Sequence, residues 1–452
     1  MARILIKNAL AVLTLDAIGE IKGGDVLVDG PAIAAVGKNL TAAADEIIDA
    51  TGKLVTPGFI NTHHHLFQVL TRCVPAVQDA KLFDWLTYLY QIWKHLTTHD
   101  LYTAALAGLG ELLLTGCTTA ADHHYLVPKD IEGDLFAAEA QAAAELGIRL
   151  HLSRGSMSLG RGAGGLPPES VIQDEDEILT DCARVIDAFH DPRPFSLCQV
   201  SLAPCSPFSV TPSLMRSVAE LARKQKVRLH THLAETLDEE RFCQERFGKR
   251  PVAYVDELGW LGPDVWLAHA VYLNAAEIEI LRKTQTGVAH CPTSNLRLGS
   301  GIAPIPAMLE AGVPVGLAVD GSASNDSSNM LRELRMSLLI HRVGTGVEAM
   351  PVRRVYQMAC TGGAKVLGRS DLGIIREGMA ADLAIFDMTG LAYAGALHDP
   401  AAALLLCGVD QRADTVLVNG RIVVRDKHLV RMDETIIAEQ ARRASERLLS
   451  AV

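Results

Sequence analysis

The alternation of apolar and polar positions divides the chain into two β-rich ends and a longer middle part. In residues 1–57 and 371–432, short apolar runs are separated by Gly, Asp and Asn, as in ILIKNALAVL and TVLVNGRIVV. Such runs are typical of short strands joined by turns. Because neither end holds enough strands for a core of its own, the pattern predicts that they pair into one small β-sandwich. The charged segment 433–452 is predicted to form a closing helix.

The middle part, residues 58–370, alternates between β-type runs and helical stretches such as LYTAALAGLGELLLTG. The β-type runs, in order, are GFINTHHH, TGCTTAADHH, IRLHLSR, FSLCQVSLAP, VRLHTHLAE, VWLAHAV, TGVAHCP and VPVGLAVDG. Eight strand–helix units in succession predict an α/β fold, a (β/α)8 TIM barrel. The alternative, an open doubly wound sheet, would favour a Gly-rich phosphate loop after its first strand, and the sequence has none.

Composition and charge limit the classes of molecule that this protein is expected to bind. The 452 residues are 49% hydrophobic and 21% charged, as in globular proteins, and carry a net charge of -11 with no run of like charge. This balance argues against binding to nucleic acid or to a membrane surface and favours a small-molecule substrate. The nine Cys residues include no CxxC pair, and no apolar run resembles a leader or a membrane span. We therefore expect a cytoplasmic protein, and apolar patches such as AAALLLCGV predict a homo-oligomer.

Side chains that bind metals occur where the predicted strands end. Residues His63 to His65 end the first strand, and Asp122 to His124 end the second. The fifth to eighth strands end with His232 and Glu235, His269, His290 and Asp320. The carboxyl ends of barrel strands form one rim, so these residues are expected to converge. Residues two apart in a strand share a side, which places His63 and His65 together and turns His64 away. Imidazole and carboxylate ligands suit a divalent ion such as zinc, which would activate a water molecule.

The order of PGFINTHHH, HLAE, LAHAV and AVDG, followed by GIIREGMAADLAIFD, resembles the amidohydrolase superfamily, specifically its mononuclear-metal deaminase branch. The resemblance covers nearly the whole chain and implies a barrel with a composite β-sandwich. It implies one divalent metal ion, Zn²⁺ with Fe²⁺ as the alternative, and the ligands His63, His65, His232 and Asp320. It also implies that Glu235 shuttles protons, that His269 orients the attacking water and that Asp320 takes a proton from this water.

The resemblance also indicates the reaction. Binuclear relatives carry a bridging Lys on the fourth strand, whereas SLCQVSLAP contains none, which implies one metal and hydrolytic deamination of a heterocycle. The run from Asn61 to Leu86 and the segment SLAPCSPFSV are most similar to bacterial deaminases of 8-oxoguanine, which form uric acid and ammonia. A hydroxytriazine, isoguanine, guanine, cytosine or thioadenosine is an alternative substrate. Hydrolysis of a cyclic amide is a less favoured reaction, and a non-catalytic scaffold is a less favoured role.

The residues predicted to contact the substrate are Gln68, Arg154, His123, Trp93 and Cys205. Three of them have equally simple structural interpretations: Arg154 fits a salt bridge at the rim, His123 a supporting hydrogen bond, and Trp93 the packing of an aromatic helix. Cys205 is not expected to act as a nucleophile, because a metal-activated water makes one unnecessary. The Gly- and Pro-rich loop 154–173 is predicted to close over the substrate, with a plain surface insertion as the alternative.

Overall fold

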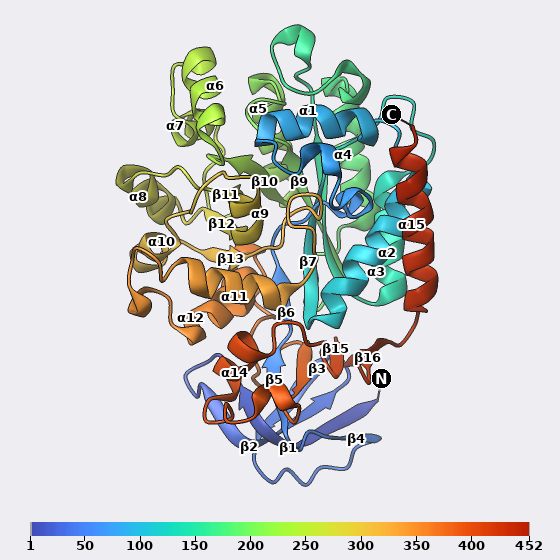
Figure 1. Cartoon of the computed structure of the whole chain (residues 1–452), viewed down its shortest axis with the longest axis vertical. Coiled ribbons are helices and arrows are strands. Elements are labelled where there is room, and N and C mark those ends of the chain that lie inside the picture. The colour runs from blue at the N-terminus through green and yellow to red at the C-terminus, as the bar shows by residue number, and fades with distance from the viewer. Residues whose placement is uncertain (1, 452) are drawn as a thin grey trace.

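The computed structural model describes residues 2–451 and contains a closed parallel barrel above a separate sheet (Figure 1). Around the barrel the strand order is β10-β11-β12-β13-β6-β7-β8-β9. The strands are β6 (Phe59–Asn61), β7 (Cys117–His124), β8 (Arg149–Ser156), β9 (Cys198–Pro204), β10 (Arg228–Leu233), β11 (Val265–His269), β12 (Gly287–His290) and β13 (Val315–Leu317). Each of the eight predicted β-type runs overlaps one of these strands, which confirms the TIM barrel.

Helices between the strands form the outer layer of the barrel. They are α1 (Leu82–Trp93), α2 (Thr98–Leu114), α3 (Leu135–Leu146), α4 (Glu175–Phe189), α5 (Pro212–Gln225), α6 (Leu237–Phe247), α7 (Pro251–Glu257), α8 (Ala275–Thr284), α9 (Pro292–Arg297), α10 (Ile305–Ala311), α11 (Met330–Ile340), α12 (Val352–Gln357) and α13 (Gly363–Val366). Local sequence sets their ends. In α3, the Asp134 side chain accepts hydrogen bonds from the first turn, and Gly147 follows the last turn with a φ of 82°.

Strands from both ends of the chain form a second sheet, which lies below the barrel in Figure 1. They are β1 (Arg3–Leu13), β2 (Glu20–Asp29), β3 (Ala32–Gly37), β4 (Glu46–Asp49), β5 (Lys53–Pro57), β14 (Leu383–Asp387), β15 (Thr415–Val418), β16 (Arg421–Arg425) and β17 (His428–Leu429). The two ends meet where β5 pairs with β14 in antiparallel fashion. The predicted pairing of the two β-rich ends is therefore confirmed. The apolar run AAALLLC, however, forms a helix, α14 (Pro400–Cys407), beside this sheet.

The closing helix α15 (Glu434–Leu449) lies along the barrel beside α2 (Figure 1). It also packs on the 3₁₀ helix η1 (Leu66–Thr71), where the Ser445 hydroxyl donates to the carbonyl oxygen of Leu70 at 2.7 Å. This contact supports the segment that follows the His63–His65 run. In the described part of the chain, every helix is too short or too polar to cross a membrane.

Candidate active site

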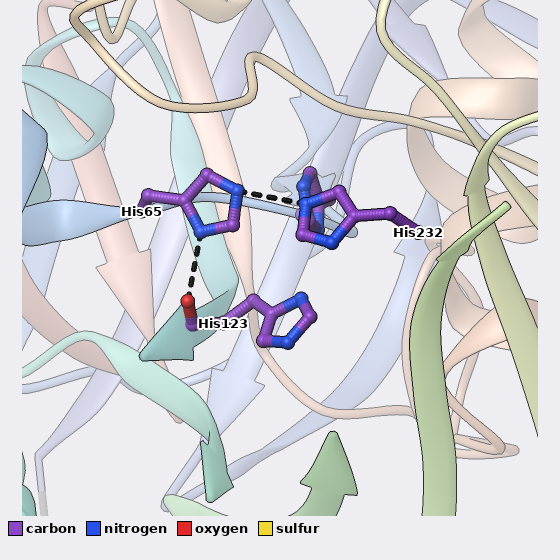
Figure 2. Close-up of side chains that lie close together, drawn as sticks. His65, His123 and His232 are labelled. Carbon is purple, nitrogen blue, oxygen red and sulfur yellow. Dashed lines mark hydrogen bonds between the residues drawn. The ribbon is translucent and has the colours of Figure 1, made fainter. Parts of the chain in front are cut away.

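Three histidines and one aspartate converge at the carboxyl ends of the barrel strands. His63 and His65 follow β6, His232 lies in β10, and Asp320 follows β13. The Nε2 atoms of His65 and His232 are 3.0 Å apart, as Figure 2 shows. The Oδ1 atom of Asp320 lies 3.3 Å from His63 Nε2 and 3.4 Å from His65 Nε2. All four side chains are buried, so the cluster is largely shielded from solvent.

Backbone carbonyls define the tautomers of two of these rings. His65 Nδ1 lies 2.7 Å from the carbonyl oxygen of His123 (Figure 2), and His232 Nδ1 lies 2.7 Å from that of Cys205. A carbonyl only accepts, so each Nδ1 carries the hydrogen. Burial holds the pKa of both rings well below the ordinary value, so both are neutral. Each Nε2 is therefore left as a lone pair that faces the other.

The tautomer of His63 is defined in the same way, through the ring of His230. His230 donates from Nδ1 to the carbonyl oxygen of Trp266 at 2.9 Å, so the Nε2 of His230 is an acceptor. That atom lies 2.7 Å from His63 Nδ1, which must then be the donor. His63 Nε2 keeps its lone pair, has no hydrogen-bond partner among residues 2–451 and points towards Asp320. His230 thus acts as an orienting residue that the sequence pattern did not reveal.

The donor set fits a divalent metal ion. Three lone pairs and a carboxylate oxygen lie together with no hydrogen available to join them, an arrangement that is unfavourable unless a cation lies among them. Ligand atoms ~2.0–2.1 Å from a tetrahedral zinc are separated by about 3.3 Å from one another. The observed separations among these atoms include 3.0, 3.3 and 3.4 Å. His123 also lies within this group of rings, but its Nε2 donates to the carbonyl oxygen of Ala203 at 2.7 Å.

Glu235 and His269 face this donor set from the neighbouring strand ends. His269 Nε2 is 3.5 Å from Glu235 Oε2 and 3.9 Å from Asp320 Oδ2, and its Nδ1 lies 2.9 Å from the side-chain oxygen of Asn295. Burial raises the pKa of Glu235. Burial alone would lower the pKa of His269, but Glu235 and Asp320 in their ionised forms outweigh it and raise that pKa. The two shifts together favour a proton on one member of the Glu235–His269 pair.

The backbone at the site is strained. Ala234, His269, Ala270 and Asp320 have φ values of 54°, 72°, 50° and 64°, in the left-handed region that residues with a side chain rarely adopt. Such strain persists only where the surrounding structure holds the chain, and it is concentrated at functional sites. At the turn after β10 the backbone N–H groups of Ala234 and Glu235 donate to the carboxylate of Glu239 at 2.8 and 2.9 Å.

The positioning role of Glu239 was not predicted, although TLDE over residues 236–239 is a helix-capping pattern that marks this turn. Ser294 and Asn295, in the run HCPTSN after β12, were not predicted either. The Ser294 hydroxyl donates to Asp320 Oδ2 at 2.5 Å, and Asn295 holds His269. Polar side chains just beyond a barrel strand were the available signal.

A cavity opens beside the cluster. Its lining residues are His65, Gln68, Leu82, Trp85, Leu86, Tyr90, Tyr125, Cys205, Phe208, His232, Glu235, His269, Leu298, Asp320 and Ser324. Two buried polar atoms of this lining have no partner among the described residues: Gln68 Oε1 and Trp85 Nε1. Burial raises the pKa of Cys205 to about 12, so its thiol keeps its proton, which argues against a nucleophilic role.

The structure brings two of the five expected substrate-contact residues, Gln68 and Cys205, to this cavity and leaves three outside it. Arg154 points to the outer layer, where its guanidinium contacts Asp181 at 2.9 Å and Gln173 at 3.1 Å, because alternate residues of β8 face opposite sides. Trp93 donates to Thr71 within the packing of α1 at 3.1 Å. The backbone carbonyl of His123 accepts a hydrogen bond from His65, and its ring donates to the carbonyl oxygen of Ala203, which fits its structural interpretation.

The loop 154–173 is attached to the body of the barrel. The backbone N–H groups of Ser158 and Leu159 each donate to the carbonyl oxygen of Ser209 at 3.0 Å, and Arg246 donates to that of Ala163 at 2.9 Å. No residue of the loop is among those that line the described cavity. Its closure over a substrate stays a prediction.

Comparisons with known proteins agree with this geometry. The model of the amidohydrolase family matches residues 54–423. The chain is 46% identical to an 8-oxoguanine deaminase of Pseudomonas aeruginosa over 452 residues, 100% of both chains. It is 36% identical to an isoxanthopterin deaminase of an unknown prokaryotic organism, over 99% of this chain and 98% of the other.

A solved structure shows the same architecture. The atrazine chlorohydrolase of Arthrobacter aurescens complexed with zinc superposes with a TM-score of 0.93 at 35% identity, covering 98% of this chain and 100% of that one. The family model covers the barrel, and the full-length relatives and the superposition extend the match over 98% or more of this chain. The chain therefore belongs to the amidohydrolase family.

Proposed function

We propose that this chain is a metal-dependent hydrolytic deaminase that converts 8-oxoguanine and water into uric acid and ammonia. The observation that carries the reaction class is the convergence of three imidazole lone pairs and a carboxylate beside a buried, proton-holding Glu235. The identity of 46% with an 8-oxoguanine deaminase over the whole chain supports the substrate.

One divalent ion would be held by His63, His65, His232 and Asp320. We infer Zn²⁺, with Fe²⁺ as the alternative, because imidazole and carboxylate ligands suit both, and because a similar hydrolase has been solved with zinc. When bound, such an ion lowers the pKa of a coordinated water and so supplies a nucleophile near neutral pH.

The side chains around that water carry the protons. Asp320 accepts a proton as a C–O bond forms at the ring carbon that bears the amino group. Glu235 donates its proton to the adjacent ring nitrogen and so makes this carbon more electrophilic. His269, held by Asn295 at 2.9 Å, directs its Nε2 at the reacting oxygen. Cleavage of the C–N bond then releases the amino group, which takes up the proton from Asp320 and leaves as ammonia. The hydroxyl proton of the new C–O group returns to Glu235, which restores this acid and leaves the carbonyl group of the product.

The cavity suits a flat, polar ring. Leu82, Leu86 and Leu298 supply apolar walls, while the Gln68 amide and the Trp85 indole N–H offer one free acceptor and one free donor. A Cβ atom at Gly321 would lie 2.0 Å from Gln68 Oε1, so glycine is required there to leave room for this amide. A planar base with carbonyl and N–H groups on its edge would satisfy both free atoms.

The surroundings of the reaction follow from two further observations. All nine Cys residues are free thiols, which supports a reducing, cytoplasmic environment. Leu391, Leu397 and Leu406 are 91%, 42% and 40% exposed near α14, which supports a homo-oligomer through this apolar surface. We place the enzyme in the cytoplasm as a homo-oligomer on these grounds.

Ammonia release from a panel of bases tests the proposal. Zinc-loaded protein is given 8-oxoguanine, isoxanthopterin, isoguanine, guanine, cytosine, thioadenosine and a hydroxytriazine in turn. We expect fastest release from 8-oxoguanine, with uric acid formed in equal amount. Faster release from another base would replace the substrate, and a metal-loaded protein that releases no ammonia from any base would contradict the deaminase.

A further inference from the structure

A second polar cluster lies on the side of β7 that faces away from the metal-binding residues. Asp122 and His124 point outward between β7 and α3, where they meet Glu139, because their neighbour His123 points inward. Atoms of the three side chains lie within 4.8 Å of one another, and all three residues are at most 1% exposed. None of the three residues lines the cavity, so the cluster is separate from the catalytic site.

The charges of this cluster do not balance if both of its carboxyl groups are ionised. Neither Asp122 nor Glu139 forms an ion pair with Lys or Arg anywhere in residues 2–451. Arg154, the cation that acts on His124, is bound to Asp181 and lies over the Phe136 ring. Both oxygens of Glu139 and Oδ2 of Asp122 have no hydrogen-bond partner in that range. Two ionised carboxyl groups in such a place would be very costly, so a proton or a cation must accompany them.

Hydrogen bonding indicates which carboxyl group is ionised. Burial raises the pKa of Asp122 to about 7, but Asp122 Oδ1 accepts the backbone N–H of Leu66 at 2.7 Å, and this hydrogen bond favours the carboxylate form of Asp122. Glu139 has no such donor among the described residues, and burial together with the neighbouring Asp122 raises its pKa well above the ordinary value. Burial lowers the pKa of His124 to about 3, so this ring brings no charge.

We propose that Glu139 is a neutral carboxylic acid that donates its proton in a hydrogen bond to the Asp122 carboxylate, and that this pair is a positioning device for the substrate-binding segment. The segment concerned is η1, which begins at Leu66. Asp122 of this pair accepts the backbone N–H of Leu66, the first residue of η1. The carbonyl oxygen of His65 accepts the backbone N–H of Gln68 at 3.0 Å. The shared proton thus acts on the orientation of Gln68 at a distance, through the backbone.

Two substitutions of Glu139 separate a neutral donor from an ionised ligand. In Glu139→Gln the amide N–H replaces the acid O–H, and we expect kcat/KM within about threefold of wild type. In Glu139→Ala the donor is lost, and we expect kcat/KM to fall about 10- to 100-fold, mainly through a higher KM, because Gln68 binds substrate. Glu145→Gln, a carboxyl-to-amide change at a half-exposed position of the same helix, is the control and should match wild type.

Measurements on the protein itself keep the test independent of folding losses. The infrared spectrum of wild type near neutral pH should contain the carbonyl stretch of protonated carboxylic acids, and Glu139→Gln should lose a part of this band that Glu235→Gln keeps. Metal analysis should give one equivalent of divalent ion in wild type and in Glu139→Gln. An acid band that is the same in wild type and Glu139→Gln, or equal losses of kcat/KM in the Gln and Ala variants, would overturn the proposal.

A second metal ion would overturn it in another way. Two equivalents in wild type that fall to one in Glu139→Gln would mean that a cation, not a proton, neutralises the cluster. The kinetic readout rests on the proposed function, because it follows ammonia release from 8-oxoguanine. The infrared and metal readouts do not depend on turnover, so a failure of the proposed substrate leaves them able to decide.

Discussion

The two ends of the barrel differ in how their buried polar groups are paired. At the floor, where the strands begin above the second sheet, Arg149 donates to Asp382 at 3.0 Å and to Asn419 at 2.6 Å. The backbone N–H of Asn419 returns a hydrogen bond to Asp382 at 2.8 Å. At the rim, lone pairs of His63, His65 and His232 face one another with no donor between them among the described residues. Arg149, Asp382 and Asn419 thus satisfy one another, whereas the rim histidines are arranged for groups that the described residues do not supply.

This difference separates the residues that stabilise the barrel from the residues that serve its function. Buried donors and acceptors that match each other cost little, and they fasten the barrel to the sheet. Buried acceptors that face each other destabilise the free protein and are tolerated where an ion and a substrate later satisfy them. Substitutions at the floor should therefore change unfolding, and substitutions at the rim should change metal binding and turnover.

The sharpest test replaces two neighbouring histidines at the rim by Ala, one at a time. His63→Ala removes one lone pair, so we expect loss of the bound metal and a fall in kcat of at least about 1000-fold. His64 points away from the others and bonds Ser328 at 2.9 Å, so His64→Ala should keep near-normal metal content. Metal analysis and ammonia release decide, and equal metal loss in both variants would contradict the assignment.

Removal of the proton-holding group should act on turnover alone. Glu235→Gln keeps the size of the side chain but cannot donate an acidic proton, so we expect kcat to fall about 100- to 10,000-fold. Metal content should stay at one equivalent, because Glu235 is outside the proposed ligand set. A variant that keeps more than a tenth of the wild-type kcat would exclude Glu235 as the proton shuttle.

At the floor the expected effect is on unfolding. Arg149→Met leaves Asp382 buried without its cation and should lower the free energy of unfolding by about 3–5 kcal/mol. Urea unfolding measures this loss, and kcat of the folded fraction should remain close to wild type. Arg193→Met, at an exposed arginine that pairs with Asp191, is the matched control. A large fall in kcat with unchanged stability would remove the distinction between rim and floor.

A smaller effect is expected at Asn295, which holds the His269 ring by a hydrogen bond. Asn295→Ala leaves His269 Nδ1 without its acceptor, and we expect kcat to fall about 10- to 100-fold with metal retained. Asn295→Asp still offers an oxygen acceptor and should recover most of the activity. If both variants were equally slow, the hydrogen bond to His269 would not be the cause.

The smallest effect concerns pH at the floor. Burial alone would raise the pKa of Asp371, but the bonded guanidinium of Arg369 outweighs it and holds the pKa at about 2, below the ordinary 3.8. A depressed pKa stabilises the fold above the unfolded value, and this stabilisation is lost as the pH falls through the folded value. Asp371→Asn should therefore unfold more easily than wild type near neutral pH, and its difference from wild type should shrink between pH 3.8 and about 2. A difference that stays constant over this window would contradict the pairing.

Local pattern was sufficient for the fold and for the rim residues. Eight β-type runs separated by helical stretches define a barrel because each run is short and apolar and each connection is long enough for a parallel crossover. The period of two within a strand and the common rim of all strands then bring His63, His65, His232 and Asp320 together. The same period separated Arg154 from the cavity, but the sequence alone did not show which side of β8 was which.

The remaining features depend on distances between segments that lie far apart in the chain. The tautomer of His63 depends on His230, 167 residues away, and through it on the carbonyl of Trp266, and no local pattern encodes such a relay. Likewise, Asp122 and Glu139 follow no distinctive motif, and only their burial beside each other without a paired Lys or Arg in the described chain points to the shared proton that we propose. The sequence by itself determined which chemistry is available, because residue types and strand periods are local. The tertiary structure decided which atoms are donors, which are acceptors and which lack a partner, because each depends on neighbours brought close by folding.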